Sequence, residues 1–174
     1  MLAAIDADRN SLLPWLPWPA VDNRTVYECI FQIERFRRER ERTDPPADNF
    51  VLGIFDRRSG EVLGGTGLHR VAHALHQAEI GYWVRGDRRQ QGICTEAVAG
   101  LLTWALRPQD RGGWGLRRIE IFCAGRNAAS QRVPEKLGLR REVHKRADRW
   151  VPGIGWDDTL GWGVLANEWA ARPA

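Results

Sequence analysis

The sequence predicts a mixed α/β fold, in which helices cover both faces of one central sheet. Its 174 residues, 43% of them apolar, are enough for one domain with a substantial core. Apolar residues recur at helical spacing before Asn49 and at strand spacing from there onwards. A strand–helix–strand segment from Ala78 to Cys123 then predicts a parallel, right-handed crossover. We therefore expect residues 1–174 to form a single domain.

The N-terminal part of the chain is predicted to be helical. A short helix is expected from Leu2 to Leu13, closed by the proline-rich turn Pro14–Pro19. A longer helix is expected to begin at Thr25, because Thr25 and Glu28 match the capping-box pattern. Its apolar residues at helical spacing are Val26, Cys29, Ile30, Ile33 and Phe36. The mixed arginine and glutamate run that follows is interpreted as a solvated face.

The rest of the chain shows strand patterns interrupted by helical ones. The expected strands are Phe50–Phe55, Glu61–Leu68, Ala78–Val84, Arg118–Cys123, Leu139–Ala147 and Trp156–Leu165. The expected helices are Gly92–Leu106 and Ala128–Leu137, and Gly138 stands where a helix commonly ends. His69, His73 and His76 are predicted to lie in a loop before the third strand. The element order is therefore ααβββαβαββ.

Composition argues against several classes of protein. The formal net charge is +4, and 24 of the 26 cationic side chains are arginines spread over the whole chain, so we expect no nucleic-acid partner. Apolar runs fall short of the ~20 residues that span a membrane, and a signal-peptide pattern is missing, so we expect a cytoplasmic protein without a membrane partner. The three cysteines form no CxxC pair, and His69 and His73 share a predicted loop, so we expect neither disulfides nor a metal site.

The start of the crossover helix is the most informative segment. Arg88–Ala97 reads RRQQGICTEA, so a strand feeds a helix through a short turn that contains Gly92. Backbone N–H groups at the positive end of a helix bind anions. Neither the GxxxxGK[ST] nor the GxGxxG phosphate loop is present, and the glycine-rich Leu63–Gly67 lies within a predicted strand. We interpret the glycines there as places where neighbouring backbones approach closely.

Five collinear motifs resemble one known family. Arg89–Cys94 is similar to the [RQ]-x-x-G-x-[GA] acyl-CoA loop of the GNAT N-acetyltransferases. The other motifs resemble the ribosomal-protein-alanine acetyltransferase branch, which is RimJ/RimL-like. They are Trp15–Trp18, Glu79–Val84, the N-x-x-S-x-x-V-x-E-K-L-G pattern of Asn127–Gly138, and Asp158–Trp162.

This resemblance implies a GNAT fold, with a mixed central sheet in which two parallel strands splay apart around the coenzyme. Acetyl-CoA would be the cosubstrate, with no metal. The residues assigned to it are Trp83, Val84, Arg88, Arg89, Gln90, Gln91, Gly92, Ile93, Cys94, Thr95, Asn127 and Ser130. Three departures from the family stand out. Cys94 replaces the usual glycine or alanine, Pro134 lies inside the short predicted helix and removes one backbone hydrogen bond, and the chain starts directly in a helix. The first family strand is therefore missing, or the chain starts downstream of it.

The implied reaction is direct attack of an amine on the thioester, which needs a base, an oxyanion donor and an acid. The resemblance places Ser130 as the acid, the Val84 N–H as the oxyanion donor, and Asn127 beside the pantetheine arm or a water. Asn127 also fits a helix cap and Ser130 a first helical turn. For the base we expect Glu79, with Glu120 or a water relay as alternatives.

The acceptor stays open, because a fold does not determine its substrate. By resemblance, the Trp15–Trp18 turn and the helix from Thr25 wall the amine site. The acceptor amine could belong to a protein N-terminus, an aminoglycoside or a small metabolite. The alternative function is an acyl-CoA-binding module without catalytic activity. A homodimer is possible within the family.

Overall fold

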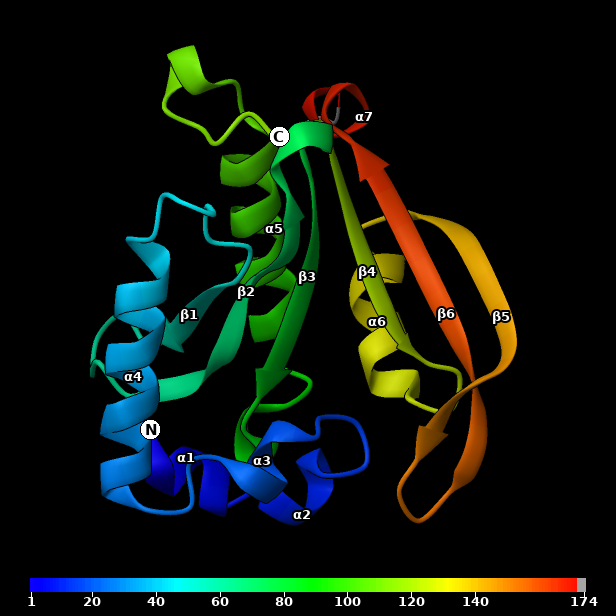
Figure 1. Cartoon of the computed structure of the whole chain (residues 1–174). Coiled ribbons are helices and arrows are strands. Elements are labelled where there is room, and N and C mark those ends of the chain that lie inside the picture. The colour runs from blue at the N-terminus through cyan, green and yellow to red at the C-terminus, as the bar shows by residue number, and fades with distance from the viewer. Residues whose placement is uncertain (172–174) are drawn as a thin grey trace.

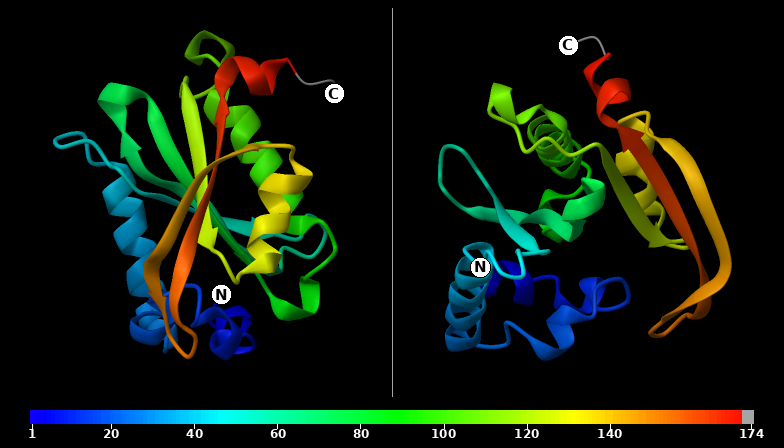
Figure 2. Two further views of the ribbon diagram at one scale, coloured as in Figure 1. Left: turned by 90° about the vertical axis from the view of Figure 1, so that its right-hand side faces the viewer. Right: turned by 45° about the horizontal axis from the view of Figure 1, so that its top comes forward.

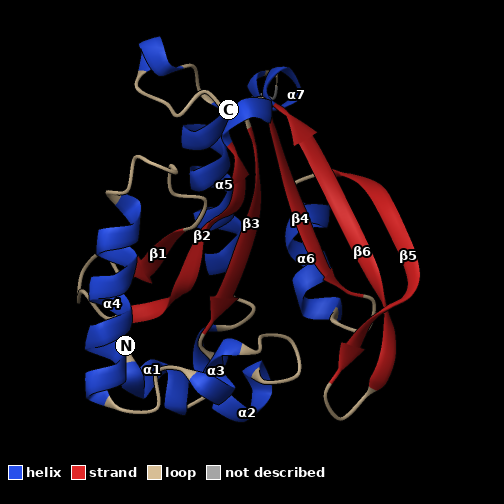
Figure 3. Ribbon diagram, in the orientation of Figure 1, coloured by secondary structure: helices blue, strands red, loops and turns tan. Residues whose placement is uncertain are grey.

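The computed structural model describes residues 1–171, and within that range six strands form one mixed sheet in the order β1-β2-β3-β4-β6-β5 (Figures 1 and 3). The strands are β1 Phe50–Phe55, β2 Val62–Ala72, β3 Gln77–Val84, β4 Arg118–Ala124, β5 Arg140–Val151 and β6 Gly155–Leu165. β3 and β4 are parallel, and the other neighbours are antiparallel. The predicted mixed α/β class and the parallel crossover are confirmed.

The parallel strands separate along their length. Their pairing covers Gln77–Glu79 of β3 and Arg118–Glu120 of β4, and it stops there in the described chain. Beyond Glu79 the two ribbons diverge toward the end of the molecule that carries the N-terminal helices (Figure 1). The backbone edges from Ile80 to Val84 and from Ile121 to Ala124 therefore face each other across a gap. The splay implied by the sequence resemblance is confirmed.

Helices cover both faces of the sheet (Figure 2). On one face lie α5 (Ile93–Leu106) and α6 (Ala128–Lys136), and on the other lies α4 (Val26–Arg40). α5 buries Val98, Leu102 and Ala105 completely against the sheet. A fully buried Val or Leu side chain contributes roughly 1.5–3 kcal/mol, so Val98 and Leu102 make α5 a main source of stability.

The N-terminal segment differs from the single helix expected over Leu2–Leu13. It forms separate helices, α1 Leu2–Asp6 and α2 Arg9–Leu12, followed by α3 Trp18–Val21. The interruption coincides with Asp8, whose carboxylate accepts hydrogen bonds from the Gly86 N–H and the Arg89 guanidinium. These long-range contacts hold the segment against the loop between β3 and α5.

α4 begins as predicted but buries a different face. The Thr25 hydroxyl accepts from the Glu28 N–H, while the Glu28 carboxylate accepts from the Arg24 N–H, one residue before the position that a capping box requires. Of the expected apolar stripe, Val26, Ile30 and Ile33 are about half exposed. Cys29 and Gln32 are the buried residues of this helix. The predicted helix is present, but its buried face is narrower than the stripe that its apolar residues form.

The remaining differences concern where elements end. β2 continues through Ala72, so His69 lies in a strand rather than a loop, and His73–Leu75 forms a short 3-10 helix η1. β5 extends to Val151, and α7 (Ala166–Ala170) was not predicted. As expected, the glycines of β2 allow close approach, since a Cβ on Gly64 would lie 2.1 Å from the Trp83 carbonyl oxygen. Among residues 1–171, helices long and apolar enough to cross a membrane are absent.

Candidate active site

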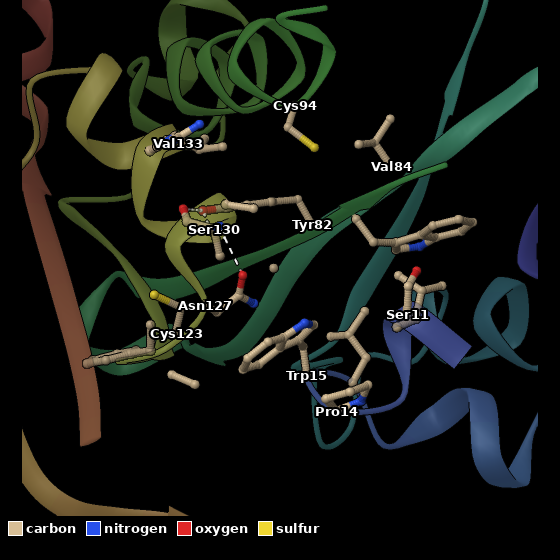
Figure 4. A pocket seen from close by; sticks show the side chains of 18 of the residues that line it. Ser11, Pro14, Trp15, Tyr82, Val84, Cys94, Cys123, Asn127, Ser130 and Val133 are labelled. Atoms are coloured by element: carbon tan, nitrogen blue, oxygen red, sulfur yellow. Dashed lines mark hydrogen bonds between the residues drawn. The ribbon is translucent and has the colours of Figure 1, made fainter. Parts of the chain in front are cut away.

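A cavity of about 940 Å³ occupies the gap between the splayed strands (Figure 4). Its walls come from β3, β4, the starts of α5 and α6, the end of β5 and the N-terminal segment Ser11–Pro17. Trp15 lies across the cavity from Asn127 and Cys123 (Figure 4). Residues far apart in the sequence therefore meet at the point where the sheet opens.

The start of α5 lies at one end of this cavity. Gly92 precedes the helix with φ +82°, and Gln90 also has a positive φ of 61°. Left-handed residues in such a turn point successive backbone N–H groups into one concave surface that can bind an anion. In the described structure the first turn of α5 has no side-chain cap. The N–H groups of Ile93 to Thr95 are therefore free to bind an anion, as the sequence predicts.

Arg88 and Arg89 line the cavity but are already engaged with acidic residues. The Arg88 guanidinium lies 3.3 Å from the Glu61 carboxylate. The Arg89 guanidinium donates to the Ser11 hydroxyl at 2.7 Å and lies 3.3 Å from Asp8. Both arginines are thus partly neutralised, and Arg89 ties the N-terminal segment to the anion loop. Sequence reasoning could not foresee these pairs because the acids lie far away in the chain.

Arg132 and Lys136 provide positive charge from the opposite wall. They are four residues apart on α6, so they share one helix face, and both line the cavity and are exposed. In the described residues neither makes an ion pair with an acidic side chain. These cations were missed, although Lys136 belongs to the motif that carried the resemblance.

Ser130 sits between α6 and β3, held by hydrogen bonds at each end. Its N–H donates to the Asn127 side-chain oxygen at 3.1 Å, which confirms Asn127 as a helix cap. Its hydroxyl donates to the Tyr82 hydroxyl at 3.3 Å, and Tyr82 donates to the Ser130 carbonyl at 2.7 Å (Figure 4). That carbonyl needs an outside donor, because Pro134 stands four residues later and has no N–H. Tyr82 therefore supplies the hydrogen bond that the Ser130 carbonyl lacks within the helix, and it orients the Ser130 hydroxyl.

Burial in apolar surroundings raises the pKa values of the titratable groups in this part of the cavity. Burial raises the pKa of Tyr82 far above its usual range, so the phenol stays protonated at neutral pH. Burial likewise raises the pKa values of Cys94 and Cys123 to about 11. Both thiols line the cavity, and Figure 4 shows Cys94 beside Val84. The neutral thiols and the neutral phenol therefore add no charge of their own to the cavity wall.

Glu79 and Glu120 lie where β3 and β4 still pair, and neither belongs to the cavity lining. Glu79 forms an ion pair with Arg70, and Glu120 forms one with Arg118 at 2.7 Å. Within residues 1–171 the carboxylate that does line the cavity is Asp148. Asp148 could not be found from sequence, because nothing in its neighbourhood predicts which way the strand faces.

A β-bulge presents Asp148 to the cavity. The register of β5 against β6 shifts between Lys145 and Arg149, and Ala147 has a positive φ of 46°. The Ala147 N–H donates to Asp158 at 2.9 Å, and Asp158 also pairs with His144 at 2.6 Å. The His144 hydrogen bond lowers the pKa of Asp158. Bulges re-aim side chains near functional sites, and here the bulge is fixed by a residue of the Asp158–Trp162 motif.

The comparisons with known proteins agree with this geometry. The family described as Acetyltransferase (GNAT) domain matches residues 1–140. The chain belongs to this GNAT acetyltransferase family. YdaF of Bacillus subtilis, provisionally named a ribosomal N-acetyltransferase, is 32% identical over 110 residues, which cover 63% of this chain and 57% of YdaF. The match thus spans little more than half of that relative.

Solved structures show the same fold. RimJ of Mycobacterium smegmatis, in complex with CoA-disulfide, is 28% identical with a TM-score of 0.75, covering 96% of this chain and 76% of that one. A RimL structure, of a ribosomal L7/L12 α-N-protein acetyltransferase with coenzyme A, has a TM-score of 0.80 at 21% identity, covering 94% and 85%. The GNAT fold and the RimJ/RimL resemblance are confirmed.

Across residues 1–171, groups of three or more His, Cys, Asp or Glu side chains that could hold a metal ion are absent. The described chain instead offers free backbone N–H groups, cations and a neutral interior, which fit a long ligand with phosphates at one end. Coenzyme A has this character.

Proposed function

We propose that this chain transfers the acetyl group of acetyl-CoA to a primary amine. The observation that carries the proposal is the continuity of one cavity, from the uncapped start of α5 to the gap between β3 and β4. The N–H groups of Gln91 to Thr95 bind the diphosphate. Arg132 and Lys136 supply positive charge for the phosphates of the coenzyme, because Arg88 and Arg89 are partly neutralised by acidic side chains. The pantetheine arm then runs along the unpaired edge of Ile80–Val84.

Asp148 acts as the base in this proposal. The acceptor enters as an ammonium ion and gives a proton to the Asp148 carboxylate, which leaves a nitrogen lone pair. That lone pair attacks the thioester carbonyl carbon, and a C–N bond forms while negative charge develops on the carbonyl oxygen. The Val84 N–H donates to this oxygen. Glu79 stays a prediction for the base, although it lies outside the cavity lining.

Ser130 acts as the acid. The C–S bond breaks, the coenzyme thiolate takes a proton from the Ser130 hydroxyl, and the second proton of the amide nitrogen passes to the Ser130 oxygen, which restores the hydroxyl. Tyr82 holds that hydroxyl in place and stays protonated. Asn127 caps the helix that carries Ser130 and contributes to the wall beside the arm.

Calorimetry and turnover together test this function. Acetyl-CoA should bind the purified chain and raise its melting temperature. Ser130→Ala should keep that binding while acetyl transfer to an amine and peptide panel, followed by release of free coenzyme thiol, falls at least about tenfold. Absence of binding at millimolar acetyl-CoA would refute the proposal. Binding without turnover by the wild type on any acceptor would favour an acyl-CoA-binding module.

A further inference from the structure

Large aromatic side chains are exposed at the tip of the β5–β6 hairpin. Trp150 and Trp156 are each 63% exposed, and their rings meet edge to face with centroids 5.8 Å apart. Trp150 and Trp156 pair directly across the two strands. Exposed aromatic groups of this size mark binding surfaces more often than isolated apolar residues do.

This aromatic pair is continuous with the cavity. Trp150, Val151 and Pro152 line the cavity on the hairpin side, and Trp15 and Leu16 line it on the side of the N-terminal segment. Both views in Figure 2, together with Figure 1, place the hairpin tip at the same end of the molecule as the N-terminal helices. The mouth at this end therefore has apolar walls on opposite sides.

Two charged residues of the hairpin line the cavity at this mouth, Asp148 and Arg149, and the Arg149 guanidinium donates to the Thr159 hydroxyl at 3.0 Å. Asp148 lies two residues before Trp150, and both residues line the cavity. A carboxylate attracts an ammonium ion, while the flanking indoles favour an apolar group and also attract cations through their ring faces. Of the other cations that line the cavity, Arg132 and Lys136 are on α6, whereas Arg149 is on the hairpin beside Asp148.

We propose that the acceptor is a primary amine carried next to an aromatic or bulky apolar group, with the ammonium at Asp148 and the apolar group between Trp15 and Trp150. This inference rests on the proposed acetyl transfer. Two kinds of acceptor carry this ammonium and ring: a peptide that begins with an aromatic residue, and a free aralkylamine. Trp156 acts as a positioning residue that holds the Trp150 ring.

Matched acceptors test the inference. The wild type, Trp150→Ala and Trp104→Ala are assayed with phenethylamine, a phenylalanine-initiated tripeptide, ethylamine and a glycine-initiated tripeptide. Trp104 is the control, because it is 43% exposed on α5, packs against Trp114 and does not line the cavity. Loss of an aromatic contact should lower kcat/KM for the two aromatic acceptors about tenfold in Trp150→Ala, with ethylamine changed less than about twofold. Trp104→Ala should behave like the wild type.

Each other outcome has a defined meaning. Equal wild-type kcat/KM for aromatic and small acceptors, or an equal loss for all acceptors in Trp150→Ala, overturns the inference while the acetyl transfer stands. If acetyl-CoA binds but no acceptor is turned over, the proposed function fails and the inference fails with it. A preference confined to the peptide pair identifies the peptide as the source, and a preference confined to the amine pair identifies the aralkylamine. Melting temperatures of the variants exclude loss of folding as the cause.

Discussion

Replacing both Arg132 and Lys136 with alanine should weaken acetyl-CoA binding about thirtyfold. Both side chains line the cavity without an acidic partner in the described chain, so each is free to contact a phosphate. A hydrogen bond to a charged group contributes about 1.5 kcal/mol at the low end, and solvent screening at these exposed positions reduces this to about 1 kcal/mol. Two such contacts give about 2 kcal/mol, which corresponds to the stated factor.

Isothermal titration calorimetry measures this loss against a matched control. Arg140→Ala/Arg141→Ala removes the same charge from exposed residues of β5 that do not line the cavity, so its affinity should stay within about twofold of the wild type. The difference between the double variants should shrink at high salt. Equal affinities of the cavity variant and the wild type would refute the assignment of these cations to the coenzyme.

Two further changes probe the interior of the cavity. Tyr82→Phe removes the acceptor of the Ser130 hydroxyl and the donor to its carbonyl, so kcat should fall about tenfold with KM for acetyl-CoA unchanged; steady-state kinetics that show an unchanged kcat would contradict this role. Burial raises the pKa values of Cys94 and Cys123 to about 11, so the reactive thiolate is scarce at neutral pH and its fraction rises about tenfold per pH unit up to that value. Iodoacetamide labelling of both thiols, read by peptide mass spectrometry, should therefore increase from pH 7 to 9. Acetyl-CoA should decrease this labelling at each pH. Labelling that acetyl-CoA leaves unchanged would count against a coenzyme in this cavity.

Local patterns predicted the elements of the fold well. The crossover from Ala78 to Cys123, the capping of α4 by Thr25 and the turn at Gly92 all depend on neighbours in the sequence, and the structure confirms them. The split of the first helix was not predictable in this way. It involves Asp8 and the loop at Gly86, which are 78 residues apart.

The candidate site was predictable where a motif carried it and not where long-range contacts decided it. Ser130 and Asn127 lie in the cavity as the resemblance implied. The partial neutralisation of Arg89 and the exposure of Asp148 depend on a distant carboxylate and on a bulge, respectively. Neither leaves a periodic signal in the sequence, so the charges available to a ligand could be assigned only from the folded chain.

A co-crystal structure with acetyl-CoA tests the central claim most directly. We expect the diphosphate within hydrogen-bond distance of the N–H groups at the start of α5, and the pantetheine arm between β3 and β4 with its thioester beside Val84 and Ser130. A coenzyme bound elsewhere, with the gap between those strands empty, would contradict it.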